Sequence, residues 1–396
     1  MRRLENVRCS VSIDKLREVT KLKKSLLVLV VLVLALSLTV TSYANDKVFK
    51  VGGISSLQTG YGRSMVSGAG LAIEEINAAG GIDGIMLSIE WEDGMLSPAI
   101  GRTGVQKLLY SDNVDALIGD HSSATIIATD EMVREYGLLQ LGMGSAMQVT
   151  ALGNPWIARV REPDNLTARV LLNYITETLG YDKIAVFYVS DQFGFGGRDV
   201  TLETMKEMGL EPVSVESHNP NDKDFSAQLL AFRNAGAQAI IAYSAPVEVG
   251  VFLRQAKQLI PDVKVFQSSV GATQTSMEVA GDAANGTYAV VTYTEDNPDP
   301  KVQEFVAAHV AKYKDVPYDF FDPLAYDAIY MLAEAIRIAG TTDRAAVRDA
   351  FCTIKGFKGV TGLEYNVMPN GETINELLLV EIVDGKHRVV DRVQGN

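Results

Sequence analysis

The chain has 396 residues, of which 47% are hydrophobic and 21% charged, and its formal net charge is −13 at pH 7. This composition is that of a globular protein and excludes a disordered or collagen-like chain. An acidic surface repels phosphate backbones, so nucleic acid is not expected as a partner. The length is sufficient for two domains that each bury a core.

The N-terminal segment has the three-part pattern of a secretory signal peptide. Lys21, Lys23 and Lys24 precede the uncharged stretch Ser25–Val40, which leads to a small-x-small sequence ending at Ala44. We expect cleavage after Ala44 and a mature protein in the periplasm. A retained membrane anchor is the alternative, but the apolar run of about 15 residues is shorter than the roughly 20 that a spanning helix needs.

Removal of residues 1–44 changes the charge and the cysteine content. That segment contains eight basic and three acidic residues, so the formal net charge of the mature chain becomes −18. It also contains Cys9, which leaves Cys352 as the only cysteine and excludes an internal disulfide. A domain of this size can be stable without disulfides in an oxidising compartment.

From Val48 onward, short apolar runs alternate with amphipathic segments. Short and nearly continuous apolar runs are typical of buried parallel strands, and they lie at Val48–Ile54, Ala116–Ile118, Leu138–Leu141, Lys183–Val189, Ala239–Ala242 and Val263–Phe266. Segments with helical spacing of apolar residues lie at Gly68–Ala79, Gly101–Tyr110, Ala124–Tyr136, Thr167–Leu179, Thr201–Met208, Phe225–Asn234 and Val247–Leu259. This alternation predicts an α/β protein with parallel, doubly wound sheets.

The number of strand–helix units favours two sheets over one. About four units precede Trp156, and about four more lie between Lys183 and Val291; a single sheet of that size is uncommon. Three further helical segments follow, at Lys301–Lys314, Pro323–Ala339 and Arg344–Thr353, and the tail has strand and tight-turn signals.

This order of elements suggests that the chain returns to its first lobe before it ends in the second. We expect lobe one to comprise residues 45–164 and 293–371, and lobe two to comprise residues 165–292 and 372–396.

Ligands of open α/β sheets bind beyond the carboxyl ends of the strands, so the loops that follow strands are the candidate site. Four such loops contain polar, aromatic and glycine residues: Ser55–Gly62, Gly119–Ser123, Gly142–Ala146 and Ser190–Gly197. Serine hydroxyls and backbone N–H groups at helix N-termini suit an anion such as a carboxylate. Helix capping without a ligand is the favoured explanation of any one loop, but several such loops at one sheet edge favour a site.

Signals for catalysis, metal binding and cofactors are weak. Asp120, His121 and Ser122 are residue types of a catalytic triad, but sequence neighbours cannot face one another as a triad must. The four histidines are scattered without metal-ligand spacing. The glycines at 194, 196 and 197 do not match the dinucleotide-binding pattern. We therefore expect a protein that is not an enzyme and that uses neither a metal nor a cofactor.

Five stretches carry a family resemblance: Gly68–Gly84, Asp191–Gly197, Lys223–Ala227, Leu253–Ala256 and Ala280–Ala284. Together they resemble the type I periplasmic binding proteins, and most closely the leucine/isoleucine/valine-binding branch of ABC importers. The resemblance extends from about Val48 to the C-terminus. It implies two Rossmann-like lobes with parallel central sheets, joined by three hinge crossings, that close over an amino acid or similar solute. It also implies a monomer that docks on an ABC permease in the inner membrane.

The resemblance places part of the solute site in lobe one. Tyr61 corresponds to the family's aromatic residue in the first loop. Ser123, with Ser122 beside it, corresponds to the serine that takes the ligand carboxylate. Ser145 and Ala146 stand where the family has a small residue and a threonine, so the threonine hydroxyl is missing and Ser145 is its candidate substitute.

The lobe-two side of the site departs further from the family. Phe193 stands where the family has a tyrosine, and Ala245 lies near a second aromatic position. Ser269 falls where an acid pairs with the ligand ammonium. Because a buried ammonium without a carboxylate partner is costly, either Glu248 or Asp120 takes over or the solute has no ammonium.

We interpret this pattern as a hint of an organic acid, an amide or another small polar solute. The predicted function is therefore solute capture for an ABC importer. The alternative is a periplasmic ligand sensor that docks on a membrane signalling protein, because that function needs the same fold and cleft.

Overall fold

The computed structural model describes residues 47–317, 319–374 and 376–394. The predicted signal segment, residues 1–44, lies outside the described residues. The compact unit that begins at Val48 contains two large sheets and a two-stranded pair over the described residues. We call the first large sheet with its helices lobe one, and the second large sheet with its helices lobe two.

The sheet of lobe one is parallel, with strand order β2-β1-β3-β4-β5. Its strands are β1 (Val48–Ser55), β2 (Met86–Asp93), β3 (Ala116–Gly119), β4 (Leu139–Gly142) and β5 (Ile157–Arg159). The helices between them are α2 (Gly60–Ala78), α3 (Pro98–Tyr110), α4 (Ser123–Tyr136) and α5 (Gln148–Ala151). The central strands β3 and β4 are buried throughout, as their short apolar runs predict.

The sheet of lobe two has the order β14-β13-β10-β9-β8-β6-β7. Its strands are β6 (Ile184–Val189), β7 (Ser214–His218), β8 (Ala239–Tyr243), β9 (Lys264–Gln267), β10 (Tyr288–Val291), β13 (Glu376–Val383) and β14 (Lys386–Gln394). Strands β6 to β10 pair in parallel, whereas β13 and β14 add an antiparallel edge. The parallel sheet predicted from the sequence is therefore extended by a C-terminal hairpin.

The helices of lobe two are α6 (Asp164–Asn173) with a π-helical turn at Tyr174–Thr178, α7 (Gln192–Glu207), α8 (Ser226–Asn234), α9 (Pro246–Leu259) and α10 (Gln274–Ala280). Short 3-10 turns lie at Ser269–Ala272 and Gly281–Ala283. In the described part of the chain, no helix is both long and apolar enough to span a membrane.

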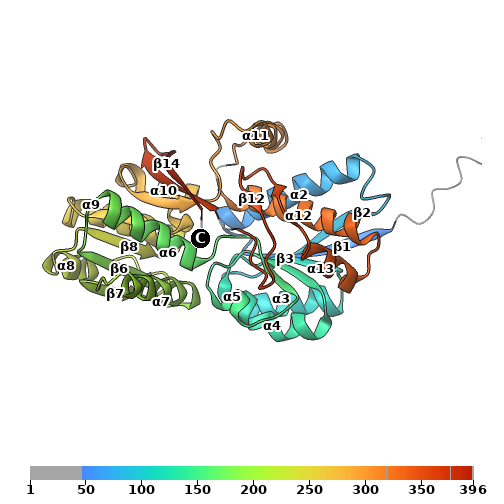
Figure 1. Cartoon of the computed structure of the whole chain (residues 1–396), viewed down its shortest axis with the longest axis horizontal. Helices are drawn as coiled ribbons and strands as arrows, with labels where there is room; N and C mark the ends of the chain where they lie inside the picture. The colour runs from blue at the N-terminus through green and yellow to red at the C-terminus, as the bar shows by residue number, and fades with distance from the viewer. Residues whose placement is uncertain (1–46, 318, 375, 395–396) are drawn as a thin grey trace, which may run out of the picture. The chain divides into compact units, whose positions relative to one another are not determined.

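After β10 the chain returns to lobe one. The returning elements are α11 (Pro300–Tyr313), α12 (Phe321–Ala339), α13 (Arg344–Phe351), β11 (Phe357–Lys358) and β12 (Glu364–Tyr365). Helix α12 packs against α2 (Figure 1), and its apolar residues share one core with strands β1, β3 and β4. Between residues 48 and 394 the chain thus passes between the lobes three times: after β5, after β10 and before β13.

Two helices begin earlier than the sequence predicts. Helix α2 begins at Gly60, where Thr59 Oγ1 accepts a hydrogen bond from the Gly62 N–H at 3.0 Å. Helix α7 begins at Gln192, where an oxygen of Asp191 accepts from the Gly194 N–H at 2.9 Å. Both first turns are rich in glycine, which disfavours helix, and tertiary packing overrides that preference.

The glycine at position 194 illustrates the reason. A Cβ there would lie 1.9 Å from the carbonyl oxygen of Val189, so only glycine lets α7 start directly against the end of β6.

The packing of α12 on α2 depends in the same way on Gly68. A Cβ at that position would lie 2.0 Å from the carbonyl oxygen of Asp322. We predict that Gly68→Ala lowers the free energy of unfolding by about 2–3 kcal/mol, because overpacking forces the helices apart. Urea unfolding of residues 45–396 measures this loss.

Gly70→Ala in the same helix is the matched control, since a Cβ there meets only the Tyr313 hydroxyl at 3.4 Å. An equal loss in both variants would show that helix packing is not the cause.

Candidate functional site

The two lobes touch where the loops after their strands meet. A Cβ on Gly196, in the first turn of α7, would lie 2.9 Å from the Cβ of Ala146 in the loop after β4. Helix α4 of lobe one also packs against α7. The carboxyl-end loops of both sheets therefore form one junction, which is the place where open α/β sheets bind ligands.

Ser122 and Ser123 have different roles at the start of α4. Ser122 is the N-cap, and its hydroxyl oxygen accepts from the Thr125 N–H at 3.4 Å. Ser123 is buried, and its Oγ accepts from the Ala146 N–H at 3.2 Å. Helix capping thus accounts for Ser122, whereas Ser123 joins two predicted site loops and keeps its own hydroxyl hydrogen to donate.

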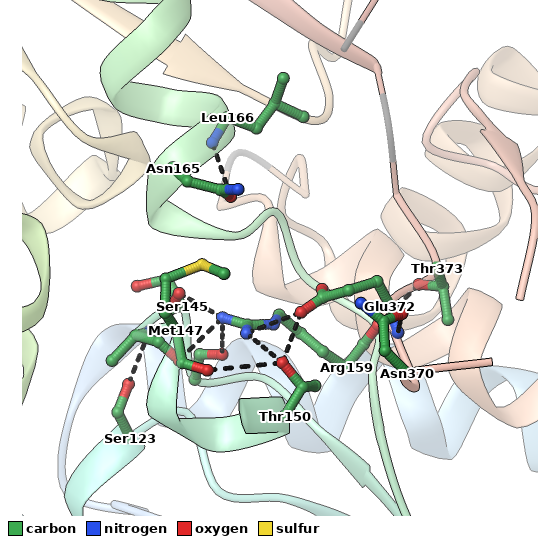
Figure 2. Close-up of polar contacts among 12 residues, drawn as sticks. Ser123, Ser145, Met147, Thr150, Arg159, Asn165, Leu166, Asn370, Glu372 and Thr373 are labelled. Atoms are coloured by element: carbon green, nitrogen blue, oxygen red, sulfur yellow. Dashed lines mark hydrogen bonds and ion pairs between the residues drawn. The ribbon is translucent and has the colours of Figure 1, made fainter. Parts of the chain in front are cut away.

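Arg159, at the end of β5, holds the loop after β4 in place. Its guanidinium donates to the carbonyl oxygens of Gly144, Ser145 and Ala146. Figure 2 shows the guanidinium between this loop and Glu372. Because the carbonyl of one residue and the N–H of the next point in opposite directions across a trans peptide, the N–H groups of Ser145 and Ala146 are directed away from Arg159.

The same guanidinium anchors the third crossing between the lobes. It donates to Glu372 Oε1 at 2.8 Å and to Thr150 Oγ1 at 2.9 Å, and Thr150 in turn donates to Glu372 at 2.6 Å. The backbone of Arg159 also donates to the Gly371 carbonyl at 2.7 Å and accepts from the Thr373 hydroxyl at 2.7 Å. Arg159 was not among the site residues predicted from the sequence, although an arginine inside a run of buried strand residues is a signal of such a role.

Tyr61 lies in an aromatic cluster on lobe one. Its ring is edge-on to His121, with centroids 5.0 Å apart, and lies 6.1 Å from the ring of Phe321 at the start of α12. Burial raises the pKa of Tyr61 to about 12, so its hydroxyl stays protonated at neutral pH. Asp120 holds His121 through a contact of 2.7 Å to Nδ1 and accepts from the Ser122 N–H at 3.2 Å.

On lobe two, Phe193 and Ala245 flank the end of β8. Phe193 is half-buried and edge-on to Tyr243, with ring centroids 6.0 Å apart. Ala245 is the N-cap residue of α9 and has no side chain to cap with. Glu248, in the first turn of that helix, accepts from the Asn221 N–H at 2.9 Å. Glu248 and Asp120, the two acids expected to replace the missing one, thus have partners of their own.

Ser269 instead contacts an ion pair that was not predicted from the sequence. Its hydroxyl donates to Glu162 Oε1 and accepts from Arg161 at 2.9 Å, and Arg161 Nε donates to the same Glu162 oxygen at 3.1 Å. All three residues are buried. The guanidinium lies over the rings of Phe320 and Phe321, 5.2 and 5.4 Å from their centroids.

Several buried polar atoms around this junction have no hydrogen-bond partner among the described residues. They include Glu162 Oε2 and Ser268 Oγ, whereas the Ser145 hydroxyl lies within reach of the Asp164 carboxylate. Buried polar atoms in folded proteins are nearly always paired, so unpaired ones at one place require a ligand or water. No group of three or more His, Cys, Asp or Glu within the described ranges is placed to hold a metal.

We predict that Arg159→Met lowers the free energy of unfolding by about 3–5 kcal/mol, because it leaves the buried Glu372 carboxylate without its counter-charge. Chemical denaturation of residues 45–396 checks this. Arg169→Met is the control: Arg169 pairs with Glu207 at 2.9 Å, but both side chains are about half exposed. Its loss should stay below about 1 kcal/mol, and similar losses in the two variants would refute the anchoring role.

Asp164, at the start of α6, gives the fold a dependence on pH. Burial raises its pKa to about 6, although Arg161 nearby favours the charged form. In the unfolded chain the carboxyl titrates near 3.9. Between about pH 4 and 6 the folded state therefore holds a proton that the unfolded state has released, so the stability contribution of Asp164 falls as the pH rises.

We predict that Asp164→Asn becomes more stable relative to the wild type as the pH rises from 4 to 7. The relative gain is roughly 3 kcal/mol, from a shift of about two pKa units. Denaturation midpoints at three or four pH values measure it, with Asp182→Asn at an exposed position as control. A difference that is constant with pH in Asp164→Asn would contradict the shifted titration.

Comparisons with known proteins show the family and the fold of the chain. A model of the family described as "Periplasmic binding protein" matches residues 49–386. The leucine-, isoleucine-, valine-, threonine-, and alanine-binding protein of Pseudomonas aeruginosa is 30% identical over 305 residues, which cover 77% of this chain and 81% of that protein.

Two solved structures share the fold. The branched-chain amino acid transporter substrate binding protein LivJ from Streptococcus pneumoniae, in complex with isoleucine, superposes with a TM-score of 0.81 at 23% identity. It covers 88% of this chain and 100% of its own. A solute binding protein from R. palustris in complex with benzoate superposes with a TM-score of 0.80 at 19% identity. The match covers 88% of this chain and 97% of that protein.

Proposed function

Since the chain belongs to the periplasmic binding protein family, we propose that it captures a small polar solute, an amino acid or a related carboxylate or amide, and delivers it to an ABC permease in the inner membrane. Its family and its relatives are binding proteins and not enzymes. The protein acts in the periplasm as a monomer, after removal of residues 1–44.

One observation carries this proposal: buried polar side-chain atoms without partners belong to residues at, or next to, the contacts between the lobes. Glu162 Oε2 comes from the segment that follows β5 of lobe one, and Ser268 Oγ comes from lobe two. Leaving such atoms unpaired costs about 1–3 kcal/mol each. A polar solute held between the lobes supplies the missing hydrogen bonds.

The lobe-one side of the junction suits an acceptor group such as a carboxylate. Ser123 and Ser145 each have a hydroxyl hydrogen to donate, and that of Ser145 also lies within reach of the Asp164 carboxylate. The positive end of the α4 dipole lies at Ser123. These donors are held rigidly because Arg159 fixes the loop through its carbonyl groups. The aromatic rings of Tyr61 and Phe193 cover the apolar part of the solute from opposite lobes.

Lobe closure is the functional event. A solute that contacts both lobes binds the closed state more tightly than the open one, and this difference shifts the population towards closure. The three crossings act as the hinge. The permease then distinguishes the loaded from the empty protein by the relative position of the lobes.

A ligand screen tests the function. Residues 45–396, freed of bound solute by unfolding and refolding, are heated with amino acids, aromatic acids, short-chain acids and amides. We expect at least one class to raise the melting temperature, because a ligand at 100 times its Kd stabilises by about 2.7 kcal/mol. A flat response to every class would refute solute capture.

A variant at the lobe contact tests closure. We predict that Gly196→Ala weakens binding of the best solute about tenfold, or ~1.4 kcal/mol, because its Cβ would meet Ala146 at 2.9 Å and hold the lobes apart. Stability without solute should stay the same, since the contact lies between the lobes. Gly70→Ala, far from this contact, is the control for calorimetric titration. Equal affinities of all three proteins would exclude closure at Gly196.

A further inference from the structure

Asp319 joins the two lobes through a contact with the start of a helix. It lies directly before α12, in the returning part of lobe one, and only 4% of its surface is exposed. Its Oδ1 accepts a hydrogen bond at 2.7 Å from the backbone N–H of Gln274, the first residue of α10 in lobe two. Its Oδ2 accepts from the Ser64 hydroxyl of α2 at 3.4 Å. One carboxylate thus connects two segments of lobe one to a helix of lobe two.

The donor is a group that a helix cannot satisfy by itself. The first N–H groups of an α-helix have no acceptor within that helix. The N-cap residue of α10, Thr273, accepts from the Ser276 N–H at 3.3 Å, and lobe one supplies the acceptor for the Gln274 N–H. A carboxylate at this place also interacts favourably with the positive end of the helix dipole.

The bond to Gln274 depends on how the lobes are placed. Helices α2 and α10 contact each other, and a Cβ on Gly60, the first residue of α2, would lie 3.0 Å from Thr275 Oγ1. When the lobes separate, Ser64 stays beside Asp319 because both belong to lobe one, whereas Gln274 moves away with lobe two. The bond to Gln274 is therefore made only while the lobes are closed.

Burial opposes part of what this bond contributes. Burial raises the pKa of the Asp319 carboxyl, while its two hydrogen bonds and the nearby His387 favour the charged form. Two acids close by, Glu278 and Asp322, disfavour it. Because the net contribution of one hydrogen bond is modest, we expect Asp319 to favour the closed state by about tenfold.

We propose that Asp319 is a latch for lobe closure, a positioning residue that holds α10 against lobe one without touching the solute. This inference rests on the proposed function, because a latch has an effect only if the lobes open and close. The apparent affinity for any solute scales with the population of the binding-competent state. Loss of the latch should therefore weaken the binding of every solute by one factor and leave the ratios between solutes unchanged.

Position 274 allows the donor to be removed while the helix is kept. Proline lacks the N–H and is favoured at the first helical position. Thr273 before it has φ −72° and ψ 154°, a conformation compatible with a following proline. Gln274→Pro thus removes the donor, whereas Gln274→Ala keeps it and is the matched control, since the residue is exposed.

Asp319→Ala removes the acceptor, and Asp343→Ala is its control. Asp343 caps α13 within lobe one, where its Oδ1 accepts from the Ala346 N–H at 2.9 Å. Both substitutions remove a carboxylate that binds the first turn of a helix, but only Asp319 connects the lobes.

Single-molecule energy transfer measures lobe closure directly in residues 45–396. One dye is on the exposed native Cys352 of lobe one, and the other is on Asp262→Cys, in an exposed turn of lobe two. Without solute, we expect Gln274→Pro and Asp319→Ala to reduce the closed population about tenfold, and both controls to match the wild type. The double variant should lose no more than either single one, because both changes break one bond. Equal closed populations in all variants would overturn the latch.

Calorimetric titration with leucine, succinamate and benzoate provides the second readout. Every probe that binds the wild type should bind Gln274→Pro about tenfold more weakly, while the free energy of unfolding without solute stays that of Gln274→Ala. Factors that differ between probes would show that Asp319 contacts the solute, and the latch would be wrong. If no probe binds the wild type, solute capture fails for these classes, whereas the energy-transfer measurement still decides on the latch.

Discussion

The buried guanidinium of Arg159 is the interaction on which the site depends. It binds three successive carbonyl groups after β4 and the carboxylate of Glu372 on the third crossing. One side chain thus fixes both the loop after β4 and the segment by which the chain returns to lobe two. Because this network is shielded from water, its bonds are strong only while every member is present.

Two buried arginines at the junction pair with carboxylates, although the chain is acidic overall with a formal net charge of −13. Arg159 pairs with Glu372, and Arg161 pairs with Glu162. The net charge of the whole chain therefore says little about the proposed solute, which would be selected by the local charges and hydrogen-bonding groups.

The sequence predicted the fold better than the site. Val48–Ile54 was predicted as a strand and forms β1, which is one residue longer. A short continuous apolar run of this kind is typical of a buried strand. The start of α7 was missed, because its glycines disfavour helix and are required only by contacts with Val189 and Tyr243. Ser269 was recognised as a departure from the family, but Glu162, its actual acidic partner, lies 107 residues away in the sequence.

The sequence by itself determined the alternation of strands and helices and the family, and it predicted the loops at which a solute site would lie. These follow from local patterns, since burial of a strand or a helix face leaves its period in the chain. The tertiary structure alone decided which acid meets Ser269 and which cation orders the loop after β4. Both contacts join side chains on different elements that only the folded structure brings together. The periodic pattern of apolar residues along one strand or helix carries no information about such contacts.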